Sequence, residues 1–202
     1  PVPMEQVMAV MDHAGVDKAV LLAEDYSAEM GQPIITNEEV KQLVDLEPDR
    51  FIGFASVDPR DCGAKEQLEQ AFSELKLSGL KLNLSHLQMY PDDKRLEPLL
   101  KLCMQYEKPV MFHSGFSWEP DSPSKYGRPI LYEDIAVEYP SLRFCLAHLG
   151  WPWVDELCMM LLKYPNVYTD TATVFMDSPA NYYDQIFMKN MAPGWVQNNL
   201  MD

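Results

Sequence analysis

Six apolar runs, each bounded by turn residues, alternate along the chain with segments of helical period. The apolar runs cover residues 17–24, 51–59, 79–85, 109–115, 143–150 and 166–174. Hydrophobic side chains recur at helical spacing near residues 7–14, 37–48, 64–77, 91–107, 130–140, 151–165 and 179–191, which predicts helices. Such alternation is typical of parallel strands joined by helical crossovers. The sequence therefore predicts a single α/β domain over residues 1–202.

The lengths of the connections favour a barrel over an open sheet. Connections from helix to strand are short, such as residues 15–17 and 165–166, whereas those from strand to helix include the long segments 25–36 and 114–128. In a (β/α)8 TIM barrel the loops that follow the strands build the active site at the mouth. A doubly wound sheet, the alternative, usually carries a glycine-rich turn after its first strand, and no GxGxxG or GxxxxGK[ST] occurs here. We therefore expect a TIM barrel.

The count of strands falls short of a closed barrel. Six are visible where eight are required, because the sequence opens on a helix and shows no strand after residue 174. The first and last strands of a barrel are neighbours, so one contiguous gap is expected in the wall. We expect an incomplete barrel, a fragment of a longer protein. Unpaired strand edges and open core surface favour association, so a homo-oligomer is one expected way of covering the gap.

The charge and the cysteine content limit the binding partners and the cellular compartment that we expect for this protein. The chain has 16 Lys and Arg against 31 Asp and Glu, a formal net charge of −15, which repels phosphate backbones and makes nucleic acid an unexpected partner. The four cysteines form no CxxC pair, which favours a reduced, cytoplasmic protein over a disulfide framework. No apolar run approaches the ~20 residues of a membrane span, so we expect no membrane partner. The partner that we expect is a small-molecule substrate.

Two consecutive predicted strands end in a histidine. His113 follows the apolar run PVMF, and His148 follows CLA. In a barrel, both imidazoles would lie side by side at the mouth. Neutral imidazoles in such places are common metal ligands and general bases; the alternative is a pair of hydrogen-bonded core histidines. Pro152, shortly after His148, is expected to open the next helix.

Polar side chains interrupt two other strands. In GLKLNL, period-two alternation sends the leucines one way and Lys81 and Asn83 the other. A lysine on a strand buried on both faces is costly unless it is paired or functional, so both residues are candidates for the barrel lumen, with Asn83 nearer the mouth. Asp170 in NVYTDTA is either a site residue or the hydrogen-bond partner of a neighbouring polar group.

Loop residues after the strands are candidates for substrate binding. His86 follows GLKLNL and could reach substrate, although a loop histidine is often only solvated. Trp118 and Arg128 lie in the longest loop, where binding groups often occur and Arg128 could clamp a carboxylate. Trp151 could wall a pocket or simply pack a helix onto the barrel.

A series of motifs resembles a known family. RFIGFASVDP, GLKLNL followed by YPDD, PVMFHSG, KYGRPILYEDIAVEYPSLRF, LAHLGWPW and NVYTDTA occur in the order seen in the amidohydrolase-related metal-dependent enzymes. This group includes aminocarboxymuconate-semialdehyde decarboxylase and related hydrolases and hydratases. The resemblance extends over nearly the whole chain, from about Lys18 onward.

The resemblance implies a distorted (β/α)8 barrel of the metal-dependent hydrolase type that holds one divalent ion, with Zn²⁺ expected and Mn²⁺ as the alternative. Family members take metal ligands from an HxH motif on the first strand, a His on the fifth and an Asp on the eighth, while a His on the sixth assists the metal-bound water. By this resemblance His113 matches the fifth-strand ligand and His148 the catalytic sixth-strand histidine. The sequence contains no HxH and no terminal Asp strand, and Asn83 stands where relatives often have a histidine.

Two functions follow from this resemblance, and a third hypothesis, a binding or scaffolding protein, comes from another class. The first is a metal-dependent hydrolase, in which His148 deprotonates or positions the water that attacks a carbonyl. The second is non-oxidative decarboxylation of an aromatic or unsaturated carboxylic acid by the same ligands. The third is a non-catalytic barrel with an incomplete metal site. A carboxylated Lys81 that bridges two ions is a further variant of the metal site.

Overall fold

The computed structural model describes residues 2–172 and shows one parallel sheet. Its strands follow one another in the order β1-β2-β3-β4-β5-β6, so neighbours in space are neighbours in sequence. The strands are β1 Ala19–Leu22, β2 Phe51–Ala55, β3 Gly79–Leu82, β4 Val110–Phe112, β5 Phe144–Leu146 and β6 Val167–Thr169. The six predicted strands are confirmed.

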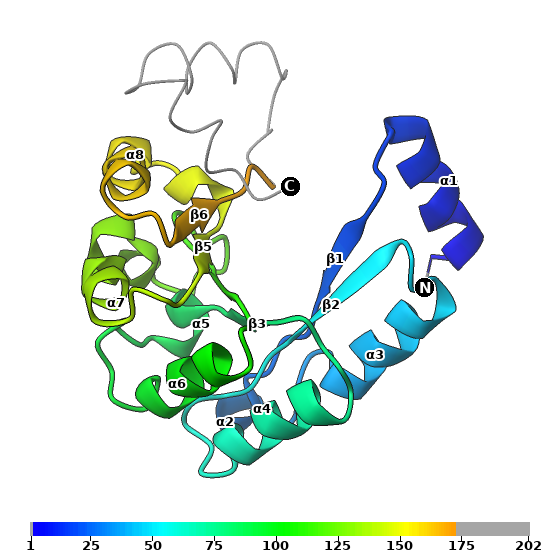
Figure 1. Ribbon diagram of the computed structural model, residues 1–202, viewed down its shortest axis with the longest axis horizontal. Coiled ribbons are helices and arrows are strands. Elements are labelled where there is room, and N and C mark those ends of the chain that lie inside the picture. The colour runs from blue at the N-terminus through cyan, green and yellow to red at the C-terminus, as the bar shows by residue number, and fades with distance from the viewer. Residues whose placement is uncertain (1, 173–202) are drawn as a thin grey trace.

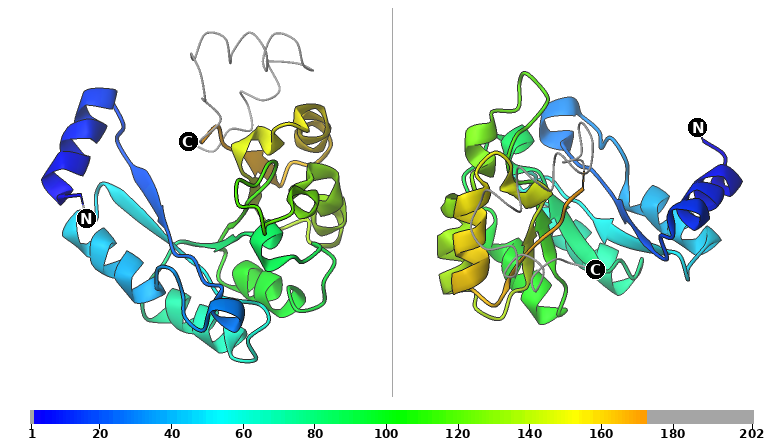
Figure 2. Two further views of the ribbon diagram at one scale, coloured as in Figure 1. Left: turned by 180° about the vertical axis from the view of Figure 1, so that it is seen from behind. Right: turned by 90° about the horizontal axis from the view of Figure 1, so that it is seen from above.

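Helices cover the outer, convex side of the curved sheet (Figures 1 and 2). The longer ones are α1 Met4–Ala14, α3 Asn37–Leu46, α4 Ala64–Ser73, α6 Glu97–Gln105, α7 Glu133–Glu138 and α8 Val154–Lys163. Short helical turns lie in the loops after the strands: α2 Ser27–Met30, α5 Leu84–Leu87, η1 Ser124–Gly127, η2 Pro129–Tyr132 and η3 His148–Gly150. With strands inside and helices outside, the described residues form a partial (β/α)8 barrel.

Local sequence signals set several helix ends. Thr36 caps α3 by accepting the Glu39 N–H at 3.1 Å, and the Glu39 carboxylate accepts the Thr36 N–H at 2.8 Å, a complete capping box. Gly15 ends α1 in the left-handed conformation, which glycine adopts without a steric penalty.

The two faces of each strand have different chemistry. Leu80, Leu82, Val110, Phe112 and their neighbours on β5 are almost fully buried, and complete burial of one such side chain contributes about 1.5–3 kcal/mol. The intervening residues form a second row. Lys81 pairs with Met111, Met111 with Cys145, and Cys145 with Tyr168. Because side chains alternate between the two faces of a strand, this second row faces the concave inner side of the sheet.

Three predicted elements differ from the structure or fall outside it. Pro152 was expected to open a helix, which is wrong, because α8 begins only at Val154 and Pro152 follows a cis peptide bond in the preceding turn. The segment 130–140 is helical but begins with the 3₁₀ turn η2. The helix expected at 179–191 lies outside the described residues.

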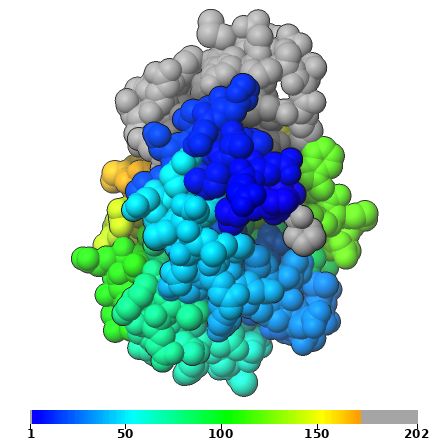
Figure 3. Space-filling view, turned by 90° about the vertical axis from the view of Figure 1, so that its right-hand side faces the viewer, coloured from blue at the N-terminus to red at the C-terminus, as the bar shows by residue number. Residues whose placement is uncertain are grey.

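Helices α1 and α3 form one outer face of the molecule (Figure 3).

The two outermost strands each have one neighbour. Within residues 2–172, β1 pairs only with β2, and β6 only with β5. None of the helices in this range has both the length and the apolar content for a membrane crossing.

Candidate functional site

Polar side chains gather where the strands end. Asn83, His113 and Asp170 each stand two residues beyond the inner row formed by Lys81, Met111 and Tyr168. Because side chains alternate along a strand, this spacing places His113 and Asp170 over the same inner side, one step nearer the mouth, while Asn83 caps the short helix α5 there. His148 follows β5 in the same region.

His113 presents a buried ring nitrogen to this inner side. Its main-chain N–H donates to the Leu82 carbonyl at 2.8 Å, which anchors it beside β3. Its Nε2 is buried and has no hydrogen-bond partner among the described residues. Burial, together with the nearby Lys81 and His148, lowers the pKa of His113 to about 3, and a hydrogen bond to the Phe116 backbone opposes this change. The imidazole is therefore neutral at pH 7, with a lone pair available to a metal ion.

His148 lies beside it, as the strand positions predict. The two ring centroids are 5.0 Å apart at an interplanar angle of 59°. The Nδ1 atom of His148 is 2.8 Å from the Ala172 carbonyl oxygen. Burial lowers the pKa of His148, while the Ala172 contact and the Asp170 carboxylate oppose that shift. Two neutral imidazoles thus face the same space.

Asp170 connects the ends of β5 and β6. Its Oδ1 accepts the main-chain N–H groups of His148 and Ala172, both at 3.0 Å. Its Oδ2 lies 3.6 Å from the Cys145 thiol. Asp170 is thus a partner of neighbouring polar groups, and at the same time it contacts the candidate catalytic histidine.

Lys81 lies on the inner side below these groups, 6% exposed. Burial lowers its pKa, and the nearby Asp170, Cys145 and Glu24 oppose that change. Glu24, which follows β1, was not identified from the sequence. Its position at the end of an apolar strand was the available signal, as it was for His113.

The loops after β1 and β3 meet at the other side of the mouth. The Tyr26 ring packs on His86 with centroids 3.9 Å apart, and Tyr26 also hydrogen-bonds Asn83. Asn83 caps α5 by accepting the His86 N–H at 3.2 Å. Asn83 and His86 are therefore brought together, and Tyr26 joins them as a residue that the sequence reasoning missed.

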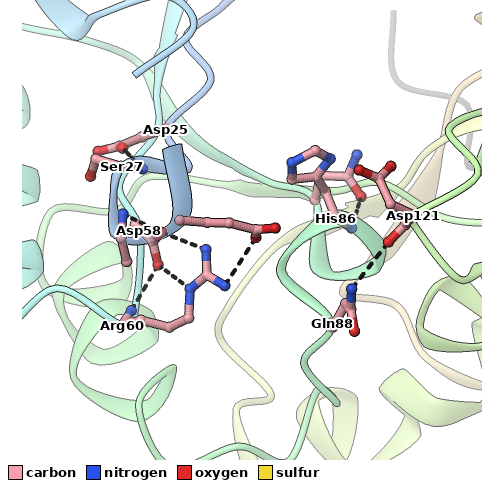
Figure 4. Close-up of polar contacts among 10 residues, drawn as sticks. Asp25, Ser27, Asp58, Arg60, His86, Gln88 and Asp121 are labelled. Atoms are coloured by element: carbon pink, nitrogen blue, oxygen red, sulfur yellow. Dashed lines mark hydrogen bonds and ion pairs between the residues drawn. The ribbon is translucent and has the colours of Figure 1, made fainter. Parts of the chain in front are cut away.

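Polar contacts also brace the neighbouring loops (Figure 4). Arg60 donates from Nε to Oδ1 of the buried Asp58 at 2.9 Å and from a terminal nitrogen to Oδ2 at 2.8 Å. Gln88 donates to the Asp121 carbonyl at 3.1 Å, which ties the end of α5 to the long loop after β4.

Three aromatic rings stand on the loops just past the histidines. Phe116 packs edge-on against Trp118 and Trp151, with centroid distances of 5.0 and 5.9 Å. Trp118 is 63% exposed. The Phe116 N–H donates to the Trp151 carbonyl at 2.6 Å, so the two loops are fastened together. Trp118 and Trp151 therefore belong to one cluster.

Arg128 points to a different partner. Its Nε donates to the Glu156 carboxylate on α8 at 2.8 Å. To clamp a substrate carboxylate, the guanidinium would have to leave Glu156.

One candidate metal ligand, His113, lies among the described residues. No group of three His, Cys, Asp or Glu side chains within residues 2–172 is placed to hold a metal ion. His113 nevertheless fits a ligand, because its Nε2 is buried and its ring is neutral. Such an orphaned buried nitrogen is costly unless something binds it.

Comparisons with known proteins agree with this architecture. A family model described as "Amidohydrolase" matches residues 3–189. An uncharacterized TIM-barrel protein from Bordetella bronchiseptica is similar with a TM-score of 0.80 and 21% identity, over 98% of this chain and 68% of that one. The 5-carboxyvanillate decarboxylase of Novosphingobium aromaticivorans, solved with manganese and 4-hydroxy-3-methoxy-5-nitrobenzoic acid, is similar with a TM-score of 0.62 and 19% identity, over 97% of this chain and 68% of that one.

A curated relative matches a shorter stretch. Protein fluG of Emericella nidulans is 31% identical over 71 residues, which are 35% of this chain and 8% of that protein. The structural similarities confirm the predicted TIM-barrel fold, of which this chain has part.

Proposed function

Because the chain belongs to the amidohydrolase family, we propose that it is a metal-dependent hydrolase, in which water attacks a carbonyl-type small molecule at the mouth of the barrel. The observation that carries the proposal is the pair of neutral imidazoles at the ends of β4 and β5, 5.0 Å apart, one with an unpartnered buried nitrogen among the described residues. A core histidine pair without chemical role would be expected to satisfy that nitrogen.

His113 would hold the metal through Nε2. One divalent ion, for which we expect Zn²⁺ with Mn²⁺ as the alternative, would supply Lewis acidity to the substrate or to water. The manganese in the Novosphingobium decarboxylase supports a divalent ion in this fold. Within residues 2–172, no group of three His, Cys, Asp or Glu side chains would complete such a site.

His148 would act as the general base. Burial lowers its pKa, so at pH 7 the ring is neutral and can accept a proton from water. Because Nδ1 faces the Ala172 carbonyl, Nε2 is the nitrogen that takes the proton. Lys81 would set the charge around this step, and Asp170 would hold the turn that carries His148.

The substrate would lie against the loops at the mouth. Asn83 and His86 would contact it from the side of β3, and Trp118 and Trp151 from the loops after β4 and β5. Arg128 would bind a carboxylate only after release from Glu156.

Non-oxidative decarboxylation of an aromatic or unsaturated acid is the second candidate. The buried Lys81 amine favours it, because in its protonated form it would attract a substrate carboxylate strongly in a site of low dielectric. The decarboxylase among the similar structures adds support. A barrel without catalytic activity is the third outcome.

A substrate panel with matched variants would test these candidates. The protein loaded with Zn²⁺ or Mn²⁺ is assayed with lactones, amides and hydroxybenzoates, with CO₂ detection in parallel. Hydrolysis without CO₂ supports the first proposal, and CO₂ release supports the second. His113→Gln and His148→Gln should each abolish the activity found, whereas His13→Gln on the exposed side of α1 should not. Inactivity of the metal-loaded protein on the whole panel would leave the non-catalytic barrel.

A further inference from the structure

Asp170 fastens the turn that carries His148 to the end of β6. Its Oδ1 accepts the N–H groups of His148 and Ala172 at 3.0 Å each. Its own main-chain carbonyl accepts the Leu149 N–H at 2.9 Å. Three hydrogen bonds to one residue therefore hold the loops after β5 and β6 in a fixed relation.

The turn at His148 needs such support. His148 has φ 61° and Leu149 φ 49°, a left-handed conformation that residues other than glycine rarely adopt. Strained backbone of this kind persists only where the surroundings over-determine it. The N–H groups of both strained residues donate to Asp170, so this one residue meets the requirement directly.

The same contacts determine which ring nitrogen of His148 carries the proton. Nδ1 is 2.8 Å from the Ala172 carbonyl oxygen, and a carbonyl oxygen only accepts hydrogen bonds. Nδ1 therefore bears the hydrogen, and in the neutral ring Nε2 bears the lone pair. Ala172 is itself held through its N–H by Asp170.

We propose that Asp170 is a positioning residue that fixes His148 in its Nδ1–H tautomer and orients Nε2 towards the proton to be removed. The proposal rests on the proposed role of His148 as a general base. In the step that it serves, the O–H bond of water breaks, the proton passes to Nε2, and Nδ1 keeps its own proton. The oxygen keeps the electron pair with which it attacks the carbonyl carbon, and the π electron pair of the C=O bond moves to the carbonyl oxygen.

Two substitutions separate positioning from other roles. Asp170→Ala removes the oxygen that both N–H groups need, whereas Asp170→Asn keeps one amide oxygen in that place. Asp61→Ala is the matched control, because Asp61 makes the same kind of bond to the N–H two residues on, that of Gly63 at 2.9 Å, in the loop after β2. Thermal unfolding of each variant checks that it folds.

Nitrogen NMR of metal-free, histidine-labelled protein reads the tautomer directly, and His148→Gln assigns the signals. We expect wild type, Asp170→Asn and Asp61→Ala to show the Nδ1–H form, and Asp170→Ala to lose it. Under hydrolysis conditions Asp170→Ala should lower kcat by about 10–100-fold with little change in KM, as is common for residues that orient a catalytic histidine, and Asp170→Asn should retain most of the activity.

Either of two results would overturn the proposal. One is an unchanged Nδ1–H form in a folded Asp170→Ala. The other is a loss of activity in Asp170→Asn as deep as that of His148→Gln, which would make the carboxylate charge itself the functional group. The second result remains decisive should Asp170→Ala fail to fold. Full activity of His148→Gln would instead refute the base role, while the NMR result would still report on positioning.

Discussion

Gly115 offers a direct test of how closely the two histidine-bearing loops approach. It lies two residues after His113 with φ +87°, and a Cβ built there would be 2.3 Å from the Trp151 carbonyl oxygen and 2.8 Å from the Trp151 nitrogen. All three of its nearest contacts are main-chain atoms, so no side chain can swing away. Gly31 is the matched control, because its φ is +78° and a Cβ there would meet nothing within 4 Å in the structure as described.

The expected cost of Gly115→Ala has two parts. The left-handed backbone costs a residue with a Cβ about 1–2 kcal/mol, and Gly31→Ala should show this part alone. Overpacking adds about 1–3 kcal/mol, because the loop after β5 must move. We therefore expect Gly115→Ala to lower the free energy of unfolding by about 2 kcal/mol more than Gly31→Ala does.

Urea denaturation of both variants measures that difference. The same displacement should separate the rings of His113 and His148, so the activity found should fall in Gly115→Ala and stay unchanged in Gly31→Ala. Equal destabilisation by the two substitutions, within about 0.5 kcal/mol, would refute the close approach of the loops.

Three further predictions concern titration, thiols and substrate. Folding lowers the pKa of His113 to about 3, so below pH ~6.5 the unfolded chain binds a proton that the native chain does not. The free energy of unfolding of the metal-free protein should therefore fall by about 1 kcal/mol more than that of His113→Gln between about pH 7.5 and 5.5. Equal decreases for the two proteins in urea denaturation would contradict this. All four cysteines are free, and Cys62 alone is exposed. A thiol reagent should therefore react rapidly with one thiol in the native protein and with four in urea. Rapid reaction of several thiols in the native protein would refute the burial of the other three. Trp118, 63% exposed, should be replaceable by Leu with little change in thermal midpoint but with a raised KM; an unchanged KM for every substrate used would remove it from the proposed binding surface.

Strand order and the adjacency of the two imidazoles were predictable from sequence. Each apolar run is one strand of a parallel sheet, and consecutive runs are neighbours, so polar residues at equivalent strand ends had to meet. The hydrophobic period carried that information. The chemical roles of His113 and His148 stay predictions until the variants are assayed.

Other features depend on tertiary contacts and left no local signal. β3 ends at Leu82, and Asn83 begins a short helix instead of continuing the strand. Pro152 looked like a helix opener because proline suits that position in general, yet the turn before α8 holds it. Tyr26 could be linked to His86 only after the loops after β1 and β3 were brought together, since nothing in the spacing of the two residues relates them.

The hydrogen bond from Phe116 to Trp151 and the close approach of Gly115 to Trp151 also bear on how this mouth can change during evolution. A substitution that moves one of these two loops is expected to move the other, so the distance between His113 and His148 should change only when both loops change. The loops after β1 and β3, which meet through Tyr26 and His86, form a separate pair. Substrate preference could drift through that second pair while the spacing of the imidazoles stays constant.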